Sequence, residues 1–238
     1  MSGNSGLVDL VDRHQNEIFK LLDVVSIMAS RGEAVATGGN YSLKLNDQFI
    51  LISRSGVDKA KLKNSDLLII DEKEKIFENA DFSLKTNNDL LKQSVKTSAE
   101  TPLHLEIFKQ TDAKCVLHSH GPFSLIFAQM FLLDGNIYGV GEIKDLEMMK
   151  AFKGILTHEN KVMVPIFENS QDMNFLSNQF IQTYKDFNNS ADQMAPGFIL
   201  KGHGLYVWGE SVEEAKRHLD AFNYLFEYYY RLWTVKNK

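Results

Sequence analysis

Cysteine, proline and positive charge are scarce in this sequence of 238 residues, and each shortage excludes a class of protein. Cys115 is the single cysteine, which excludes an internal disulfide framework and predicts a reducing compartment, the cytoplasm. With only 4 prolines, the chain has no proline-rich linker. The longest apolar runs have the length of strands, and residues 1–6 lack the basic and apolar parts of a signal peptide. These absences predict a soluble cytoplasmic protein.

Basic residues are too few and too scattered for a nucleic-acid-binding surface. Lys and Arg number 26 against 31 Asp and Glu, so the formal net charge is −5, whereas binding to nucleic-acid phosphates needs a basic patch. What is present is an ordinary globular composition, with 44% hydrophobic and 24% charged residues. Because strand and helix patterns alternate without a linker, we predict one α/β domain over residues 7–238, preceded by a flexible tail at residues 1–6.

Hydrophobic spacing predicts the order of helices and strands. Apolar residues at three- and four-residue spacing over residues 7–29 predict an amphipathic helix. Two β-rich runs in residues 41–53, joined by Asn46-Asp47, predict a hairpin. Ser211, with Glu214 three residues later, predicts the start of a C-terminal helix. Further strands are expected at residues 66–71, 114–118, 161–167, 197–201 and 205–208, and helices near 100–110, 121–132, 145–153 and 171–188.

Three histidines form a candidate metal site. His118 and His120 lie two positions apart at the end of an apolar strand, where alternate side chains project to the same side. His203 lies between two glycines, which let the backbone turn sharply and bring an imidazole into a cleft. Three imidazoles with an open fourth position form the catalytic zinc arrangement. Spacing alone leaves open whether His203 meets the other two, and a polar strand end and a simple turn are the alternatives.

The other histidines carry weaker signals. His104 follows Glu100 by four positions, so the two can share a helix face, either at a metal or in a surface contact. His14 and His218 lie in predicted helices among charged residues, and we expect both at the surface. His158 lies in a polar loop, and no role is predicted for it.

Three short polar stretches form a candidate anion site. Each lies at the end of a predicted strand or the start of a predicted helix, where backbone N–H groups and hydroxyls can bind a phosphate. Each by itself is also typical of a simple turn. The stretches are residues 37–40 (TGGN), 53–56 (SRSG) and 97–100 (TSAE).

The acidic residues and the cysteine give no catalytic assignment by themselves. Glu100 begins a predicted helix, where a carboxylate faces the positive end of the helix dipole, and Glu147 is typical of a helix surface. Cys115 lies within an apolar strand, where a packed thiol is expected. The sequence has no Gly-x-Ser-x-Gly motif, Walker loop or dinucleotide-binding fingerprint.

Taken in order, these stretches resemble the class II aldolase/adducin family over nearly the whole chain. The matching motifs are Thr37-Gly-Gly-Asn-Tyr-Ser42, Ser55-Gly-Val-Asp-Lys59, Ser98-Ala-Glu100 with the following Pro-Leu-His, His118-Ser-His120 and the Gly-His-Gly turn of His203. Within the family, three stretches resemble a dehydratase branch rather than the sugar-phosphate aldolases. These are Lys201-Gly-His-Gly-Leu-Tyr-Val-Trp-Gly209, Leu146-Glu-Met-Met-Lys150 and Ala221-Phe-Asn-Tyr-Leu-Phe-Glu227.

The resemblance implies an α/β/α sandwich on a mostly antiparallel sheet and a homotetramer with sites near the subunit contacts. It also implies one divalent metal per subunit, usually zinc, on His118, His120 and His203. Glu147 would be the acid/base residue, and Glu100 would lie next to the substrate or the metal. The phosphate of a sugar phosphate would be held by groups around five residues: Gly39, Asn40, Ser55, Gly56 and Ser98.

The implied reaction is the dehydration of a methylthio-substituted ketose phosphate to a 2,3-diketone phosphate, through a metal-stabilised enediolate, in methionine salvage. Ala99 stands where the aldolases commonly carry a second phosphate-binding serine, which favours the dehydratase over an aldolase. An aldolase or epimerase acting on another ketose phosphate is the first alternative. A non-catalytic, adducin-like interaction module is the second, and the three intact histidines argue against it.

Overall fold

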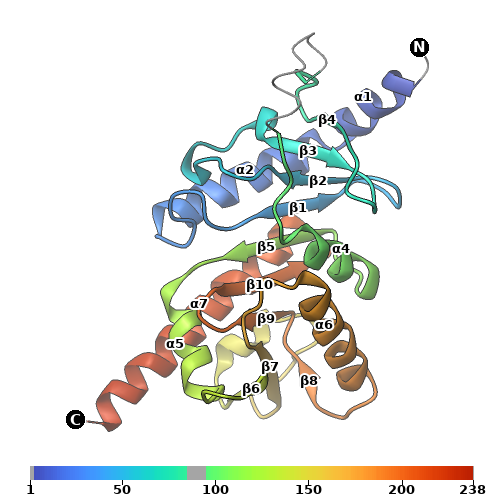
Figure 1. Cartoon of the computed structure of the whole chain (residues 1–238). Helices are drawn as coiled ribbons and strands as arrows, with labels where there is room; N and C mark the ends of the chain where they lie inside the picture. The colour runs from blue at the N-terminus through green and yellow to red at the C-terminus, as the bar shows by residue number, and fades with distance from the viewer. Residues whose placement is uncertain (1–2, 85–94, 238) are drawn as a thin grey trace.

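A central sheet of ten strands organises the described part of the chain (Figure 1). The computed structural model describes residues 3–84 and 95–237. Within them the strands pair in the order β4-β3-β2-β1-β5-β10-β9-β7-β6, with β8 beside β7. Neighbouring strands are antiparallel, except that β7 runs parallel to β8 and β9. The strands are β1 (Tyr41–Lys44), β2 (Ile50–Ser53), β3 (Leu67–Ile70), β4 (Ile76–Asn79), β5 (Cys115–Ser119), β6 (Tyr138–Lys144), β7 (Lys161–Phe167), β8 (Gln193–Met194), β9 (Gly197–Leu200) and β10 (Gly204–Gly209).

Helices cover both faces of the sheet. One face carries α1 (Gly3–Arg13), α2 (Gln15–Ser30), α5 (Pro122–Phe131) and α7 (Val212–Lys236), and the other carries α4 (Thr101–Gln110) and α6 (Met173–Asn188). Successive residues of β5 face opposite sides of the sheet. Leu117 therefore packs on the side of α2, α5 and α7, and Val116 packs on the side of α4 and α6. The expected α/β/α sandwich on a mostly antiparallel sheet is confirmed. None of the described helices is long and apolar enough to cross a membrane.

Several predicted elements are present with nearly their predicted bounds. β1 and β2 form the expected hairpin, in which Asn46 Oδ1 accepts hydrogen bonds from the backbone N–H groups of Gln48 and Phe49. The strand predicted at residues 161–167 is β7. Ser211 caps α7 by accepting a hydrogen bond from the Glu214 N–H. Local turn and cap chemistry therefore fixes these bounds.

Other elements differ from the prediction. The helix predicted at residues 7–29 is two helices, because α1 ends at Arg13 and α2 begins at Gln15, and α1 already begins at Gly3, within the expected tail. Residues 145–153 form a 3-10 helix, η3 (Glu147–Ala151), rather than an α-helix. Two further 3-10 helices, η1 (Lys59–Lys61) and η2 (Asn64–Asp66), precede β3.

Three strands, β4, β6 and β8, were not predicted. β6 contains Gly139 and Gly141, which weaken a strand pattern in the sequence. A Cβ atom at Gly141 would clash with the Phe127 ring of α5, so tertiary packing requires a glycine here. The same glycine weakens the strand pattern, which is why the sequence did not predict β6.

Candidate active site

The three candidate histidines meet in space. His118 lies near the end of β5, His120 follows that strand, and His203 lies in the turn between β9 and β10. β10 pairs with β5 so that Tyr206 is opposite His118, which brings the turn of His203 to the histidine pair. The Nε2 atom of His118 lies 2.9 Å from that of His120 and 3.4 Å from that of His203. Two imidazoles on one tetrahedral zinc, with bonds of about 2.0–2.1 Å, have a similar nitrogen separation.

Hydrogen bonds at Nδ1 orient two of these rings. His118 Nδ1 donates to the Leu205 carbonyl at 3.1 Å, and His203 Nδ1 donates to Asn169 Oδ1 at 3.3 Å. The His118 ring also stacks on Tyr206, with centroids 4.0 Å apart. A ring that carries its proton on Nδ1 has a lone pair on Nε2, the form that binds a metal. The protein therefore fixes the tautomers that a metal site needs.

Glu100 completes this cluster from the start of α4. Its Oε1 atom lies 2.9 Å from His203 Nε2 and 3.4 Å from His118 Nε2. Burial opposes ionisation of Glu100, but His118 and His203 outweigh this and hold its pKa well below the usual range, so it is a carboxylate. The Nε2 atoms of the three histidines and Glu100 Oε1 thus converge, and Glu100 Oε1 accepts no hydrogen bond from any other described residue. A divalent cation satisfies all four atoms, so these residues fit a metal.

A buried chain of hydrogen bonds holds Glu100 from behind. The Asn40 amide group donates to Glu100 Oε2 and, at 3.1 Å, to Ser98 Oγ. Asn40 Oδ1 accepts from His104 Nε2, and His104 Nδ1 accepts from Ser42 Oγ at 2.7 Å. Burial lowers the pKa of His104 to about 3, so its ring is neutral.

The five residues predicted to bind a phosphate lie around one cavity. It has a volume of about 210 Å³, and Glu100 and His120 line it as well. Gly39 has a φ of 81°, and a Cβ atom there would lie 2.7 Å from the His118 carbonyl, so the close approach requires glycine. Lys59 also lines the cavity, although in the sequence it is only the last residue of the Ser55–Lys59 motif. The five residues are Gly39, Asn40, Ser55, Gly56 and Ser98.

Glu147, predicted as the acid/base residue, does not line this cavity. It lies in η3, its side chain is 69% exposed, and it forms ion pairs with Lys150 at 3.0 Å and His158 at 3.1 Å. The Lys153 N–H, just after η3, donates to His218, and His218 donates to the Trp208 carbonyl. Trp208 is near the end of β10 that lies away from His203. η3 is therefore packed near the opposite end of this strand.

The predictions for His218 and His104 are wrong. His218, expected at the surface, is 1% exposed, because its ring accepts from the Lys153 N–H at 3.1 Å and donates to the Trp208 carbonyl at 2.7 Å. His104, expected at a metal or in a surface contact, is fully buried in the chain of hydrogen bonds behind Glu100. His14 is half-buried, with Nδ1 2.8 Å from the Leu10 carbonyl. Cys115 is buried, as expected for a packed thiol.

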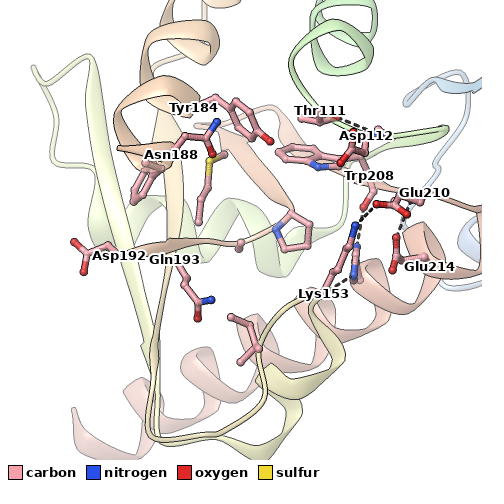
Figure 2. A pocket seen from close by; sticks show the side chains of 18 of the residues that line it. Thr111, Asp112, Lys153, Tyr184, Asn188, Asp192, Gln193, Trp208, Glu210 and Glu214 are labelled. Carbon is pink, nitrogen blue, oxygen red and sulfur yellow. Dashed lines mark hydrogen bonds and ion pairs between the residues drawn. The ribbon is translucent and has the colours of Figure 1, made fainter. Parts of the chain in front are cut away.

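A separate cavity of about 380 Å³ lies beside the far end of β10 (Figure 2). Two of its charged side chains pair, Lys153 with Glu210, and Glu214 accepts a hydrogen bond from the Glu210 N–H at 2.8 Å. None of the predicted site residues lines it. The residues predicted to bind a phosphate therefore surround the smaller cavity beside the histidines and not this one.

Known proteins resemble this chain in sequence and in fold. A methylthioribulose-1-phosphate dehydratase of Stenotrophomonas maltophilia is 35% identical over 207 residues, which are 87% of this chain and 86% of that protein. A protein of the same name from Persephonella marina is 33% identical over 219 residues, 91% of this chain and 90% of that protein. The structure of L-fuculose-1-phosphate aldolase from Thermus thermophilus has a TM-score of 0.61 at 20% identity, covering 91% of this chain and 95% of that one.

The sequence also matches a family model, described as the class II aldolase and adducin N-terminal domain, over residues 19–230. This span includes the three histidines, Glu100 and every residue around the smaller cavity. The chain belongs to the class II aldolase and adducin family.

Proposed function

We propose that this chain is a metal-dependent dehydratase that converts 5-methylthioribulose 1-phosphate to 2,3-diketo-5-methylthiopentyl 1-phosphate in methionine salvage. The names of relatives that are 35% and 33% identical support this substrate and this reaction. The observation that carries the proposal is the meeting of three histidine Nε2 atoms with Glu100 Oε1 beside a cavity lined by glycines and serines. The first group suits activation of a carbonyl, and the second suits a phosphate.

We assign zinc as the metal, with one ion per subunit on His118, His120 and His203. Three nitrogen ligands are typical of catalytic zinc, since they leave a position for the substrate. When bound, the ion polarises the substrate carbonyl at C2 and makes the hydrogen on C3 more acidic. Glu100 lies next to this position and contributes negative charge beside the metal or the substrate.

The reaction needs one proton transfer to the protein and one from the protein. A proton leaves C3, the hydroxyl on C4 takes up a proton and departs as water, and the resulting enol becomes the second ketone. We assign both transfers to Glu147, whose ion pair with Lys150 lowers its pKa and keeps it ionised, the form that accepts the first proton. General acid–base assistance of this kind is worth roughly 10²–10⁴-fold in rate.

The position of Glu147 makes this assignment depend on a second copy of the chain. Within its own chain Glu147 is exposed and lies near the opposite end of β10 from His203. It can act on a substrate at the histidines only if a neighbouring subunit presents it there. We therefore propose a homotetramer with active sites at the subunit contacts, located in the cytoplasm, with residues 7–238 as the catalytic domain of each subunit.

Proton NMR of the zinc-loaded protein with 5-methylthioribulose 1-phosphate tests the reaction. Loss of the C4 hydroxyl and formation of the diketone phosphate, without cleavage of a carbon–carbon bond, is the expected result. Two fragments would identify an aldolase, and a changed configuration at one carbon would identify an epimerase. Protein that binds no metal and leaves the substrate intact would favour an adducin-like module.

Mixed subunits test the role of Glu147. Glu147→Gln should keep its metal and lose turnover by about 10²-fold or more, whereas Glu159→Gln, another exposed glutamate nearby, should stay active. Glu147→Gln and His118→Ala subunits are each expected to be inactive, but their mixture should regain activity when one contributes the histidines and the other the glutamate. Near-normal turnover of Glu147→Gln would remove Glu147 from the mechanism. A mixture without activity, in tetramers shown to exchange subunits, would contradict a shared site.

A further inference from the structure

Lys59 is held in an inward-facing position beside the phosphate cavity. It is the first residue of η1, and Asp58 caps this short helix by accepting a hydrogen bond from the Ala60 N–H at 3.1 Å. The Lys59 N–H donates to the Ala36 carbonyl at 3.0 Å, which ties η1 to the loop that precedes Gly38. The side chain of Lys59 is buried, with 2% of the residue exposed, and it lines the cavity.

The Lys59 ammonium group forms no ion pair within the part of the chain that the structure describes. Its single hydrogen bond runs to the Arg54 carbonyl at 3.3 Å, and no carboxylate of the described residues lies within ion-pair distance of it. Asp66 is engaged with Arg54 Nε at 2.8 Å, and Glu100 is held by Asn40 and the histidines. A buried charge without a partner is strongly unfavourable. An anion in the cavity would balance this charge and stabilise the buried ammonium group.

The other groups around the cavity suit a phosphate. Gly39 and Gly56 have φ values of 81° and 74°, and Ser55 and Ser98 bring hydroxyl groups. Hydroxyls and N–H groups give a phosphate hydrogen bonds but no balancing charge. Arg54 also lines the cavity, but it pairs with Asp66, so the Lys59 ammonium group supplies the unpaired point charge. Burial lowers the pKa of Lys59 to about 8, against the opposing charge of Asp66, so the ammonium form still predominates at neutral pH.

We propose that Lys59 binds the phosphate of the ketose phosphate and makes the site selective for phosphorylated over unphosphorylated sugars. The proposal rests on the proposed function for the identity of the sugar, but the affinity for a phosphate itself can be measured without the substrate. Because Lys59 contacts the phosphate and not the carbons that react, its loss acts on binding. The expected effect on binding is about 10- to 100-fold, the value of one charge-assisted hydrogen bond.

Titration of the full, zinc-loaded protein with inorganic phosphate tests this inference by calorimetry and by thermal unfolding. Lys59→Met is expected to weaken phosphate binding by at least about tenfold, and phosphate should raise the melting temperature of the wild type but not of the variant. Lys59→Arg keeps the charge and should retain much of the binding. Lys61→Met is the matched control, because Lys61 belongs to the same short helix but its side chain is 83% exposed.

Removal of an unpaired buried charge should leave the fold intact. Without phosphate, Lys59→Met is expected to be at least as stable as the wild type. In turnover its KM should rise at least about tenfold while kcat stays within a few-fold, and Lys61→Met should match the wild type in both. Equal phosphate affinity in Lys59→Met and the wild type would overturn the inference. A fall in kcat with an unchanged KM would overturn it as well, since that pattern indicates proton transfer.

The two proposals fail in different ways. If phosphate binding depends on Lys59 but no diketone forms from 5-methylthioribulose 1-phosphate, the phosphate site stands and the assigned reaction is wrong. If the diketone forms but the Lys59→Met variant binds phosphate like the wild type, the reaction stands and the role of Lys59 is wrong.

Discussion

His104 donates a hydrogen bond from Nε2 to Oδ1 of Asn40, and this contact fixes which way the Asn40 amide faces. With its oxygen turned toward His104, Asn40 presents its NH₂ group to Glu100. The ring of His104 is itself fixed, because its Nδ1 accepts from Ser42 Oγ at 2.7 Å. A buried neutral histidine thus orients the carboxylate beside the three proposed metal ligands, although it is not itself one of them.

Two amide substitutions at His104 should separate orientation from packing. The side-chain nitrogen of Gln can replace Nε2 as the donor to Asn40, whereas Asn is too short and reaches only the region of Nδ1. We expect His104→Gln to retain most of the turnover and His104→Asn to lose about 10- to 100-fold, the usual effect of removing a group that orients a metal site. Steady-state kinetics, with zinc content and circular dichroism as controls, check this. Equal losses in two folded variants would mean that the hydrogen bond to Asn40 has no role in orientation.

The same burial makes the stability of the protein sensitive to acid. The pKa of His104 falls from 6.5 to about 3 on folding, chiefly through burial, with a smaller contribution from His118. Between these pH values the unfolded chain binds a proton that the folded chain does not. The contribution of neutral His104 to the free energy of unfolding is therefore complete above pH 6.5 and decreases as the pH falls toward 3. The decrease is about 1.4 kcal/mol per pH unit.

This effect can be isolated by difference. For chelator-treated protein, the free energy of unfolding should fall between pH 7 and pH 5 by about 2 kcal/mol more in the wild type than in His104→Gln. Urea unfolding at the two pH values measures this, and the other titrating groups largely cancel in the comparison. An identical pH dependence in the two proteins would show that His104 is protonated in the folded state.

Much of this site follows from the sequence, and the rest depends on packing that the sequence does not display. The pairing of His118 with His120 can be predicted because a strand places alternate residues on one side. In the fold, the cap at Ser211 can be predicted because its contact is local. His218 and His104 were misplaced because their partners, such as Trp208 and Asn40, are 10 and 64 positions away. The sequence shows polar neighbours at such positions but not the burial.

Lys59 and Glu147 also show that sequence spacing does not give tertiary position: Lys59 lies at the cavity without having been predicted there, and Glu147 was predicted at the site but lies away from it. Lys59 looks like one more surface lysine beside Lys61, yet a backbone contact to Ala36 turns it inward. Glu147 lies in a stretch that resembles the family, yet in the folded chain it lies near the opposite end of β10 from His203, and the homotetramer that we propose would bring the two together. Distances between segments and between subunits are tertiary properties, which periodicity and spacing do not encode.

Removal of one histidine ligand should remove the metal. His118→Ala is expected to lose bound zinc and turnover together, because its Nε2 lies nearest to those of both His120 and His203. His14→Ala, which removes a half-buried histidine from the N-terminal helices, should keep both. Metal analysis of the purified proteins and activity with added zinc provide the measurement. A His118→Ala variant that is fully metallated and active would refute the assignment of the ligands.

Two glycines of the phosphate cavity should respond differently to the same substitution. Gly39 and Gly56 both have a left-handed backbone, so an alanine at either position is strained by about 1–2 kcal/mol. At Gly56 a Cβ atom would meet nothing within 4 Å, whereas at Gly39 it would lie 2.7 Å from both the His118 carbonyl and the Tyr41 hydroxyl. Gly39→Ala should therefore lower the free energy of unfolding by about 1–3 kcal/mol more than Gly56→Ala does, because it overpacks the loop, and it should displace His118.

Urea unfolding of the two variants measures this difference, with equal m-values as the sign that both remain two-state. Zinc content gives a second observable, since only Gly39→Ala is expected to weaken metal binding by moving the backbone of His118. Equal free energies of unfolding would mean that the loop at Gly39 yields to a methyl group at no cost. The cavity would then lack the rigid wall that the proposed phosphate site beside the three histidines requires.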